Sequence, residues 1–181
     1  MPLIDYAQRY RFDPIPRDRR ASHLPAAVAD ALDGVEAVVF ACPDEYSDTA
    51  AFSERFGFGL EDCANTLVLK VIRGEQERYA AVVALGSRRL DINGAVKATL
   101  DAKRLSFARR EVATEITGMQ FGGITAFGLP PGMRVLVDSA VMERPFVVMG
   151  AGFRETKILI EPAALLRLPQ VEVAAIGFSP G

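Results

Sequence analysis

The residues most capable of chemistry lie in one glycine-rich segment, 118–132 (GMQFGGITAFGLPPG). Glycine among apolar side chains marks backbone at positive φ, or backbone that something else approaches closely. Main-chain amides at such a place can stabilise negative charge that develops in a reaction. Two interpretations stay open: a tight structural turn, or a main-chain-lined hollow approached by a helix or a ligand. The glycines and the large apolar residues between them are Gly118, Gly122, Gly123, Gly128, Gly132, Phe121, Ile124 and Phe127.

The sequence lacks the side chains that several other classes of reaction need. His23 is the only histidine, so a Ser-His-Asp triad or a histidine metal site would require that residue itself. Cys42 and Cys63 have no CxxC spacing and are expected to be small buried apolar residues. Neither a P-loop nor a GxGxxG turn after a strand is present. We therefore expect no metal centre, and neither a kinase, an ATPase nor a dehydrogenase.

Charge is unevenly distributed along this chain, whose net charge is −2. Between positions 88 and 110, basic residues outnumber Asp91 and Asp101, and the segment is strongly positive. The pattern is compatible with a solvated helical face and with a face that contacts phosphates. The candidate phosphate contacts are Arg88, Arg89, Lys97, Lys103 and Arg104.

Apolar segments and turn residues predict the elements that must position these residues. We expect helices at 24–32, 48–56, 94–102, 108–117 and 163–167. We expect strands at 35–41, 66–72, 79–85, 134–138, 145–149, 157–160 and 171–176. The polar residues 1–22 favour an extended or poorly ordered lead-in. Strands that outnumber short helices predict an α+β fold with a curved, mixed, mostly antiparallel sheet around a pocket.

The length of 181 residues suits a single globular unit. We divide it into an N-terminal extension, 1–47, whose helix and strand pack on a main domain, 48–181. The longest apolar runs are too short to cross a bilayer, and the first residues lack a signal-peptide pattern. The expected location is therefore the cytoplasm, without a membrane partner.

An ordered series of short motifs resembles the YbaK/EbsC-type aminoacyl-tRNA editing domains, which are related to the insertion domain of bacterial prolyl-tRNA synthetases. The resemblance covers about 48–176, and it depends on the order and spacing of the motifs rather than on any one of them. The motifs are 65–69 (NTLVL), 90–92 (LDI), 106–108 (SFA), 117–118 (TG), 122–128 (GGITAFG), 137–138 (VD), 150–154 (GAGFR) and 160–162 (IEP).

The resemblance implies a compact domain that hydrolyses the ester joining a wrong amino acid to transfer RNA. It implies no metal and no organic cofactor, because the substrate's ribose hydroxyl helps to position water. The implied partners are the acceptor end of an aminoacyl-tRNA and an aminoacyl-tRNA synthetase. The basic residues named above would then contact the tRNA.

Three positions depart from the family pattern. Asn65 stands where relatives carry a lysine, and it brings hydrogen-bonding groups but no charge. Lys70 cannot replace that ammonium, because an odd offset along a strand points its side chain to the opposite face. Ala126 ends a loop that proline stiffens in relatives. Near Arg154, Phe153 also replaces a lysine.

Taken together, residues and resemblance predict a deacylase that carries out trans-editing of mischarged tRNA. The expected catalytic residues are Asn65, Gly122 and Asp138. The expected substrate-binding residues are Phe121, Gly123, Ile124, Thr125, Ala126, Phe127, Gly152 and Arg154. Asp138 is equally compatible with a helix or turn cap, and Arg154 with a surface ion pair. Two alternatives stay open: a noncatalytic module that binds a tRNA 3′ end or an amino-acid-like ligand, and a hydrolase of another small ester.

Overall fold

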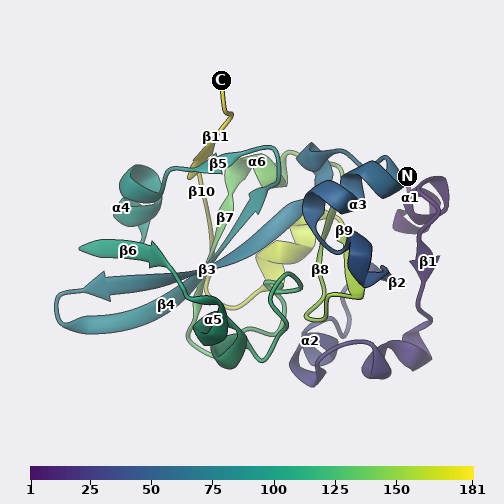
Figure 1. The fold of residues 1–181 in the computed structure, drawn as a ribbon, viewed down its shortest axis with the longest axis horizontal. Coiled ribbons are helices and arrows are strands. Elements are labelled where there is room, and N and C mark those ends of the chain that lie inside the picture. The colour runs from purple at the N-terminus through teal and green to yellow at the C-terminus, as the bar shows by residue number, and fades with distance from the viewer.

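The computed structural model describes residues 1–181, and two β-sheets form its framework (Figure 1). The larger sheet has the strand order β10-β7-β4-β3-β6. Its centre is a long antiparallel hairpin, while β7 pairs in parallel with both β4 and β10. Gly74 turns the hairpin at positive φ. The five strands are β3 (Ala64–Arg73), β4 (Gln76–Leu85), β6 (Arg104–Phe107), β7 (Arg134–Asp138) and β10 (Val171–Ala174).

The smaller sheet is antiparallel throughout, with the order β1-β2-β9-β8. One isolated bridge, between Cys63 and Val148, links the start of β3 to this sheet. The cavity described below lies where the two sheets approach each other. The four strands are β1 (Asp13–Pro14), β2 (Ala37–Ala41), β8 (Val147–Gly150) and β9 (Thr156–Ile160); β5 (Arg89–Leu90) and β11 (Gly177–Phe178) form a separate two-stranded ribbon.

Short helices surround the sheets (Figure 1). Helices α3 and α5 each end at a glycine in the left-handed region, Gly57 and Gly118. Both helices border the cavity. The helices are α1 (Leu3–Arg9), α2 (Ala26–Ala31), α3 (Thr49–Phe56), α4 (Lys97–Thr99), α5 (Arg110–Thr117) and α6 (Ser139–Met142), with 3-10 turns at Arg17–Ser22, Asp44–Tyr46, Leu60–Asp62 and Pro162–Arg167 and a π turn at Ile92–Val96. None of these helices has the length and hydropathy needed to span a membrane.

Three apolar clusters hold the elements together. The largest packs the inner faces of both sheets around residues such as Phe127 and Ile158. The second is rich in aromatic rings and joins α1 and α3 to the smaller sheet; Phe12 stacks on Phe40 with ring centroids 4.1 Å apart. The third lies on the outer face of the larger sheet under α4. The N-terminal 47 residues therefore share a core with the rest of the chain.

The predicted α+β class with a mixed, mostly antiparallel arrangement is confirmed. Two details differ from the sequence expectation. The strands form two main sheets instead of one curved sheet, and residues 1–22 are not an extended lead-in but contain α1 and a 3-10 turn. Leu3 and Ala7 bury one face of α1 in the aromatic cluster, which supplies the stability that a polar helix of this length lacks alone.

Candidate functional site

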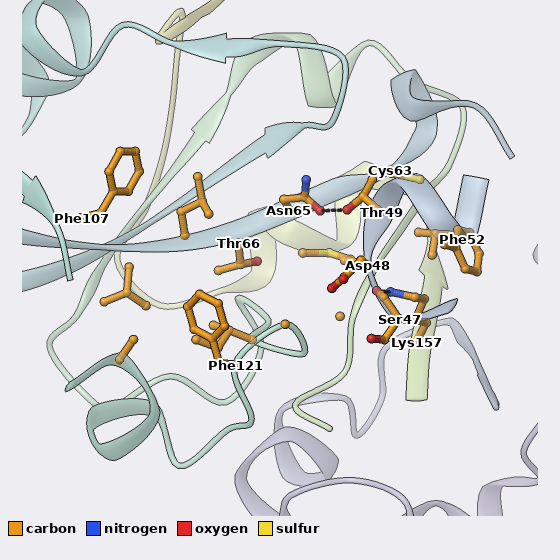
Figure 2. Close-up of a pocket in the computed structure, with 18 of the residues that line it drawn as sticks. Ser47, Asp48, Thr49, Phe52, Cys63, Asn65, Thr66, Phe107, Phe121 and Lys157 are labelled. Carbon is orange, nitrogen blue, oxygen red and sulfur yellow. Dashed lines mark hydrogen bonds between the residues drawn. The ribbon is translucent and has the colours of Figure 1, made fainter. Parts of the chain in front are cut away.

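A cavity of about 330 Å³ opens where β3, α3, α5, β8 and β9 meet (Figure 2). Its volume lies in the range of small-molecule sites. Polar groups line one end and apolar side chains the other. The lining residues are Ser47, Asp48, Thr49, Phe52, Cys63, Asn65, Thr66, Leu67, Val68, Phe107, Ala108, Ala113, Phe121, Gly122, Ile124, Val148, Met149, Gly150 and Lys157.

The polar end contains a lysine that sequence reasoning missed. Lys157 lies on the buried strand β9 and is only 7% exposed. Its Nζ donates a hydrogen bond to the Ser47 carbonyl oxygen at 2.8 Å and lies 5.2 Å from the centre of the Phe52 ring. Lys157 takes part in none of the salt bridges of the protein. Burial lowers the pKa of this ammonium, because removing it from water disfavours the charged form.

Asn65 is fixed at the same end by a neighbouring hydroxyl. Thr49, in the first turn of α3, donates its Oγ1 hydrogen to Asn65 Oδ1 at 2.8 Å (Figure 2). This bond ties the side-chain amide of β3 to the helix and leaves the amide N–H groups for another partner. Asp48, the residue before α3, is the only carboxylate lining the cavity.

Two buried hydroxyls at the cavity have no partner within the protein. Ser47 Oγ and Thr66 Oγ1 are almost fully buried, and neither makes a hydrogen bond. A buried polar atom without a partner costs free energy, on the order of 1–3 kcal/mol. Both residues line the cavity, so a side-chain rotation that turns either hydroxyl toward it would give a polar ligand a partner.

The opposite end of the cavity exposes aromatic rings. Phe107 and Phe121 are 57% and 44% exposed, and Leu67 lies near them. The guanidinium carbon of Arg110 stands 5.1 Å from the centre of the Phe121 ring. Exposed rings beside a cation are suited to contact a flat, partly charged ligand such as a nucleotide.

Cys63 lines the cavity but is not suited to act as a nucleophile. Burial raises the pKa of its thiol to about 12, and burial also raises the pKa of the nearby Cys42 thiol. The thiolate is the reactive form, so at neutral pH Cys63 stays protonated. No histidine lines the cavity, and no group of three metal-binding side chains occurs in the protein.

The glycines of the 118–132 segment mostly accommodate other parts of the protein. A Cβ on Gly123 would lie 2.7 Å from the Phe153 carbonyl carbon, and one on Gly128 would lie 2.6 Å from the Ala27 carbonyl carbon in α2. Gly152 N also donates a hydrogen bond to Gly123 O at 2.7 Å. Gly122 borders the cavity, at a φ of 88° and directly against the Arg154 guanidinium. The main-chain-lined hollow considered for this segment is therefore filled by the chain itself, except at Gly122 and Ile124, which line the cavity.

Four of the expected site residues line the cavity: Asn65, Phe121, Gly122 and Ile124. Arg154 lies at the rim, where its Nε donates to Asp44 Oδ1 at 2.6 Å, and Asp44 raises the pKa of this guanidinium. Five others are not among the lining residues, because they belong to the core or to the glycine contacts: Gly123, Thr125, Ala126, Phe127 and Gly152.

Asp138 lies away from the cavity in a buried ion pair. Its carboxylate is fully buried and accepts a hydrogen bond from Arg88 Nε at 2.7 Å. It also accepts hydrogen bonds from the amides of Ile176 and Gly177, at 3.3 and 3.2 Å. These contacts fix the end of β10 and the start of β11 to β7, which is a structural arrangement.

The basic residues predicted to contact phosphates are spread around the larger sheet. Arg88 is occupied by Asp138. Arg89 on β5, Lys103 just before β6 and Arg104 on β6 are exposed, whereas Lys97 on α4 is half-buried. None of them lines the cavity, so any contact they make would be with a part of a ligand outside it.

The sequence held one signal for the missed polar end. Lys157 directly precedes three buried apolar residues of β9, and a lysine inside a buried strand is uncommon unless it is paired. The start of α3 packs against β9, and this packing alone brings Lys157 together with Ser47, Asp48 and Thr49. That arrangement depends on tertiary packing, so spacing along the chain does not reveal it.

Comparisons with known proteins agree with this fold. A family model described as the aminoacyl-tRNA editing domain matches residues 44–168. The multifunctional Ser/Thr-tRNA deacylase ProXp-y of Escherichia coli (strain K12) is 26% identical over 124 residues, 68% of this chain and 74% of the relative.

Two solved structures share the fold at low sequence identity. A proposed trans-editing enzyme for prolyl tRNA synthetase has a TM-score of 0.72 and 21% identity, with 92% of this chain and 99% of that chain covered. The hypothetical protein APE2540 has a TM-score of 0.75 and 23% identity, with 84% of this chain and 99% of that chain covered. The family match includes every residue that lines the cavity, and the chain belongs to the aminoacyl-tRNA editing domain family.

Proposed function

We propose that this protein hydrolyses the ester bond between a misattached amino acid and the 3′ end of a tRNA. The observation that carries the proposal is the cavity itself, which has a polar end with unpaired donors and an aromatic mouth. The names of the relatives, a Ser/Thr-tRNA deacylase and a proposed trans-editing enzyme, support the same activity. An aminoacyl-tRNA synthetase would supply the mischarged tRNA.

The reaction requires no protein nucleophile. Water attacks the ester carbonyl carbon, the bond from that carbon to the ribose oxygen breaks, and the ribose oxygen takes a proton from the attacking water. The products are the free amino acid and a tRNA with a free terminal hydroxyl. The Asn65 amide, fixed by Thr49, would hold a water or a ribose hydroxyl by its remaining N–H groups. The protonated Cys63 thiol takes no covalent part.

The unpaired hydroxyls suggest which amino acids the cavity accepts. A substrate side chain that bears a hydroxyl would offer a partner to Ser47 Oγ or Thr66 Oγ1, neither of which has one within the protein. We therefore name serine and threonine as the first candidates, in line with the name of the Escherichia coli relative. The exposed rings of Phe107 and Phe121 would face the terminal adenosine, and the exposed basic residues would attract the acceptor stem.

A panel of misacylated tRNAs tests this proposal. We expect faster deacylation of seryl- and threonyl-tRNA than of alanyl-tRNA. Replacing Thr66 by Val keeps the shape but removes the hydroxyl, and it should reduce that preference by about tenfold. Thr125→Val is the matched control, because Thr125 Oγ1 is also buried and unpaired but does not line the cavity. The absence of turnover on every tRNA would refute the proposal.

The same panel separates the two alternatives. Tight retention of tRNA without turnover would favour a noncatalytic binding module, which the uncharged Asn65 makes worth testing. Turnover of small esters combined with indifference to tRNA would favour a different esterase.

A further inference from the structure

The polar end of the cavity holds a charge that the fold does not need. Lys157 is followed in β9 by Ile158, Leu159 and Ile160, all of them fully buried. An apolar residue at position 157 would avoid the cost of removing an ammonium from water. Within the protein that ammonium has one carbonyl acceptor and one aromatic ring as partners. A group retained at such a cost is often functional.

The remaining donors of Lys157 are available to a ligand. An ammonium has three N–H donors, and the Ser47 carbonyl accepts one of them. Lys157 is the only cationic residue that lines the cavity, and it lies at the end where Ser47 and Asn65 also lie (Figure 2). An acceptor oxygen that carries negative charge is therefore drawn to this end.

The charges of the cavity also determine how an aminoacyl ester is oriented. The α-ammonium of the substrate is repelled by Lys157 and attracted by Asp48, the only lining carboxylate, whose Oδ1 also lies 3.5 Å from Arg154 Nη1. The ester carbonyl oxygen then points toward the lysine. As water attacks, this oxygen becomes an oxyanion, and an adjacent ammonium stabilises it more strongly than it stabilises the ground state.

Building on the proposed function, we propose that Lys157 is a catalytic residue that donates a hydrogen bond to the ester carbonyl oxygen and stabilises the oxyanion formed during deacylation. The ammonium keeps its proton through the step and returns to its original contacts when the amino acid leaves. The groups that face it are the Cys42 and Cys63 thiols, the Asp48 carboxylate and the Arg154 guanidinium. Both thiols stay protonated at neutral pH, so they do not neutralise the lysine.

Replacement of Lys157 by Met tests the proposal, because methionine has a side chain of similar length without the charge. With the best substrate of the panel, we expect kcat to fall by about 10²–10³-fold. The matched control is Lys70→Met, because Lys70 lies on β3 with a 38% exposed side chain and pairs with Glu77 at 2.6 Å. Lys70 does not line the cavity, so its variant should keep the parent kcat.

A binding measurement separates catalysis from a structural role. The probe is adenosine with a seryl group attached through a 3′-amide, which keeps the carbonyl oxygen but is not hydrolysed. Lys157→Met should weaken its binding by about tenfold, the effect of losing one charge-assisted hydrogen bond, and should leave the binding of adenosine alone unchanged. Equal losses for both probes would mean that Lys157 only supports the shape of the cavity, and would overturn the assignment.

The remaining outcomes are also decisive. A kcat for Lys157→Met within about threefold of the parent would refute the catalytic role while the proposed function stands. A parent without turnover on any tRNA would remove the proposed function, while the comparison of the two adenosine probes still decides whether Lys157 receives the carbonyl. Should Lys157→Met not fold, Lys157→Gln retains a donor without the charge and is judged by the same two ratios.

Discussion

Replacing Asp138 by Ala will destabilise the protein far more than it affects the chemistry. Its carboxylate is fully buried and accepts hydrogen bonds from Arg88 Nε and from the amides of Ile176 and Gly177. Alanine removes all three acceptor contacts at once. It leaves the guanidinium of Arg88, whose side chain is only 21% exposed, without its counter-charge.

The expected cost follows from this burial. Removing one partner of a buried, hydrogen-bonded ion pair costs about 3–5 kcal/mol, because the other charge stays desolvated. In a chain of this length, such a loss lowers the Tm by roughly 6–20 °C. Thermal and urea unfolding followed by circular dichroism will measure it. Glu172→Ala is the control, since Glu172 pairs with Arg134 at 2.6 Å with a 48% exposed side chain, and loss of an exposed pair costs about 1 kcal/mol or less.

Activity completes the test. At a temperature where Asp138→Ala remains folded, we expect deacylation within about threefold of the parent, because Asp138 does not line the cavity. A variant that keeps the parent Tm but loses about 10²-fold or more in kcat would show that the structural interpretation of Asp138 is wrong.

Three further outcomes are expected. Gly123→Ala should destabilise the protein by about 1–3 kcal/mol in urea unfolding, because the added Cβ meets the Phe153 main chain at 2.7 Å; an unchanged midpoint would mean that the loop moves freely. Cys63 should react slowly with iodoacetamide at neutral pH, since its pKa is about 12; rapid labelling that a ligand prevents would contradict its inert role. The pKa of Lys157 is lowered in the folded state, so the unfolded chain binds more protons above that pKa, and stability should rise with pH up to the unfolded value near 10.5. Lys157→Met should flatten that rise, and an identical pH dependence in parent and variant would contradict the burial of a charged lysine.

Local patterns in the sequence predicted the helices and strands better than they predicted which segments pack against one another. The apolar run at 35–41 predicted a strand, and β2 spans Ala37–Ala41. The glycines of segment 118–132 were expected at positive φ or at a close approach of other backbone. Four of them, 118, 122, 128 and 132, have positive φ, and Gly123 is closely approached by the Phe153 main chain. Their neighbours could not be predicted, because the segments that approach them, such as α2 and the Phe153 main chain, lie far away in sequence.

For the same reason, only part of the candidate site could be predicted from the sequence. Asn65 and Phe121 were found through motifs within single segments, and both line the cavity. Asp138 looked like a site residue because its partner, Arg88, lies 50 positions earlier and meets it only through the folded structure. Lys157 looked like an ordinary residue near the start of a strand, and only the packing of α3 above β9 encloses it.

The position of β2 has a consequence for how this protein can be divided into modules. The editing-domain match begins at residue 44, yet β2 ends at Ala41 and lies between β1 and β9 in the smaller sheet. A protein shortened to begin at residue 44 would expose one whole edge of β9, the strand that carries Lys157, to solvent and to pairing with other chains. The unit that can be transplanted or fused intact is therefore longer than the stretch that homology outlines.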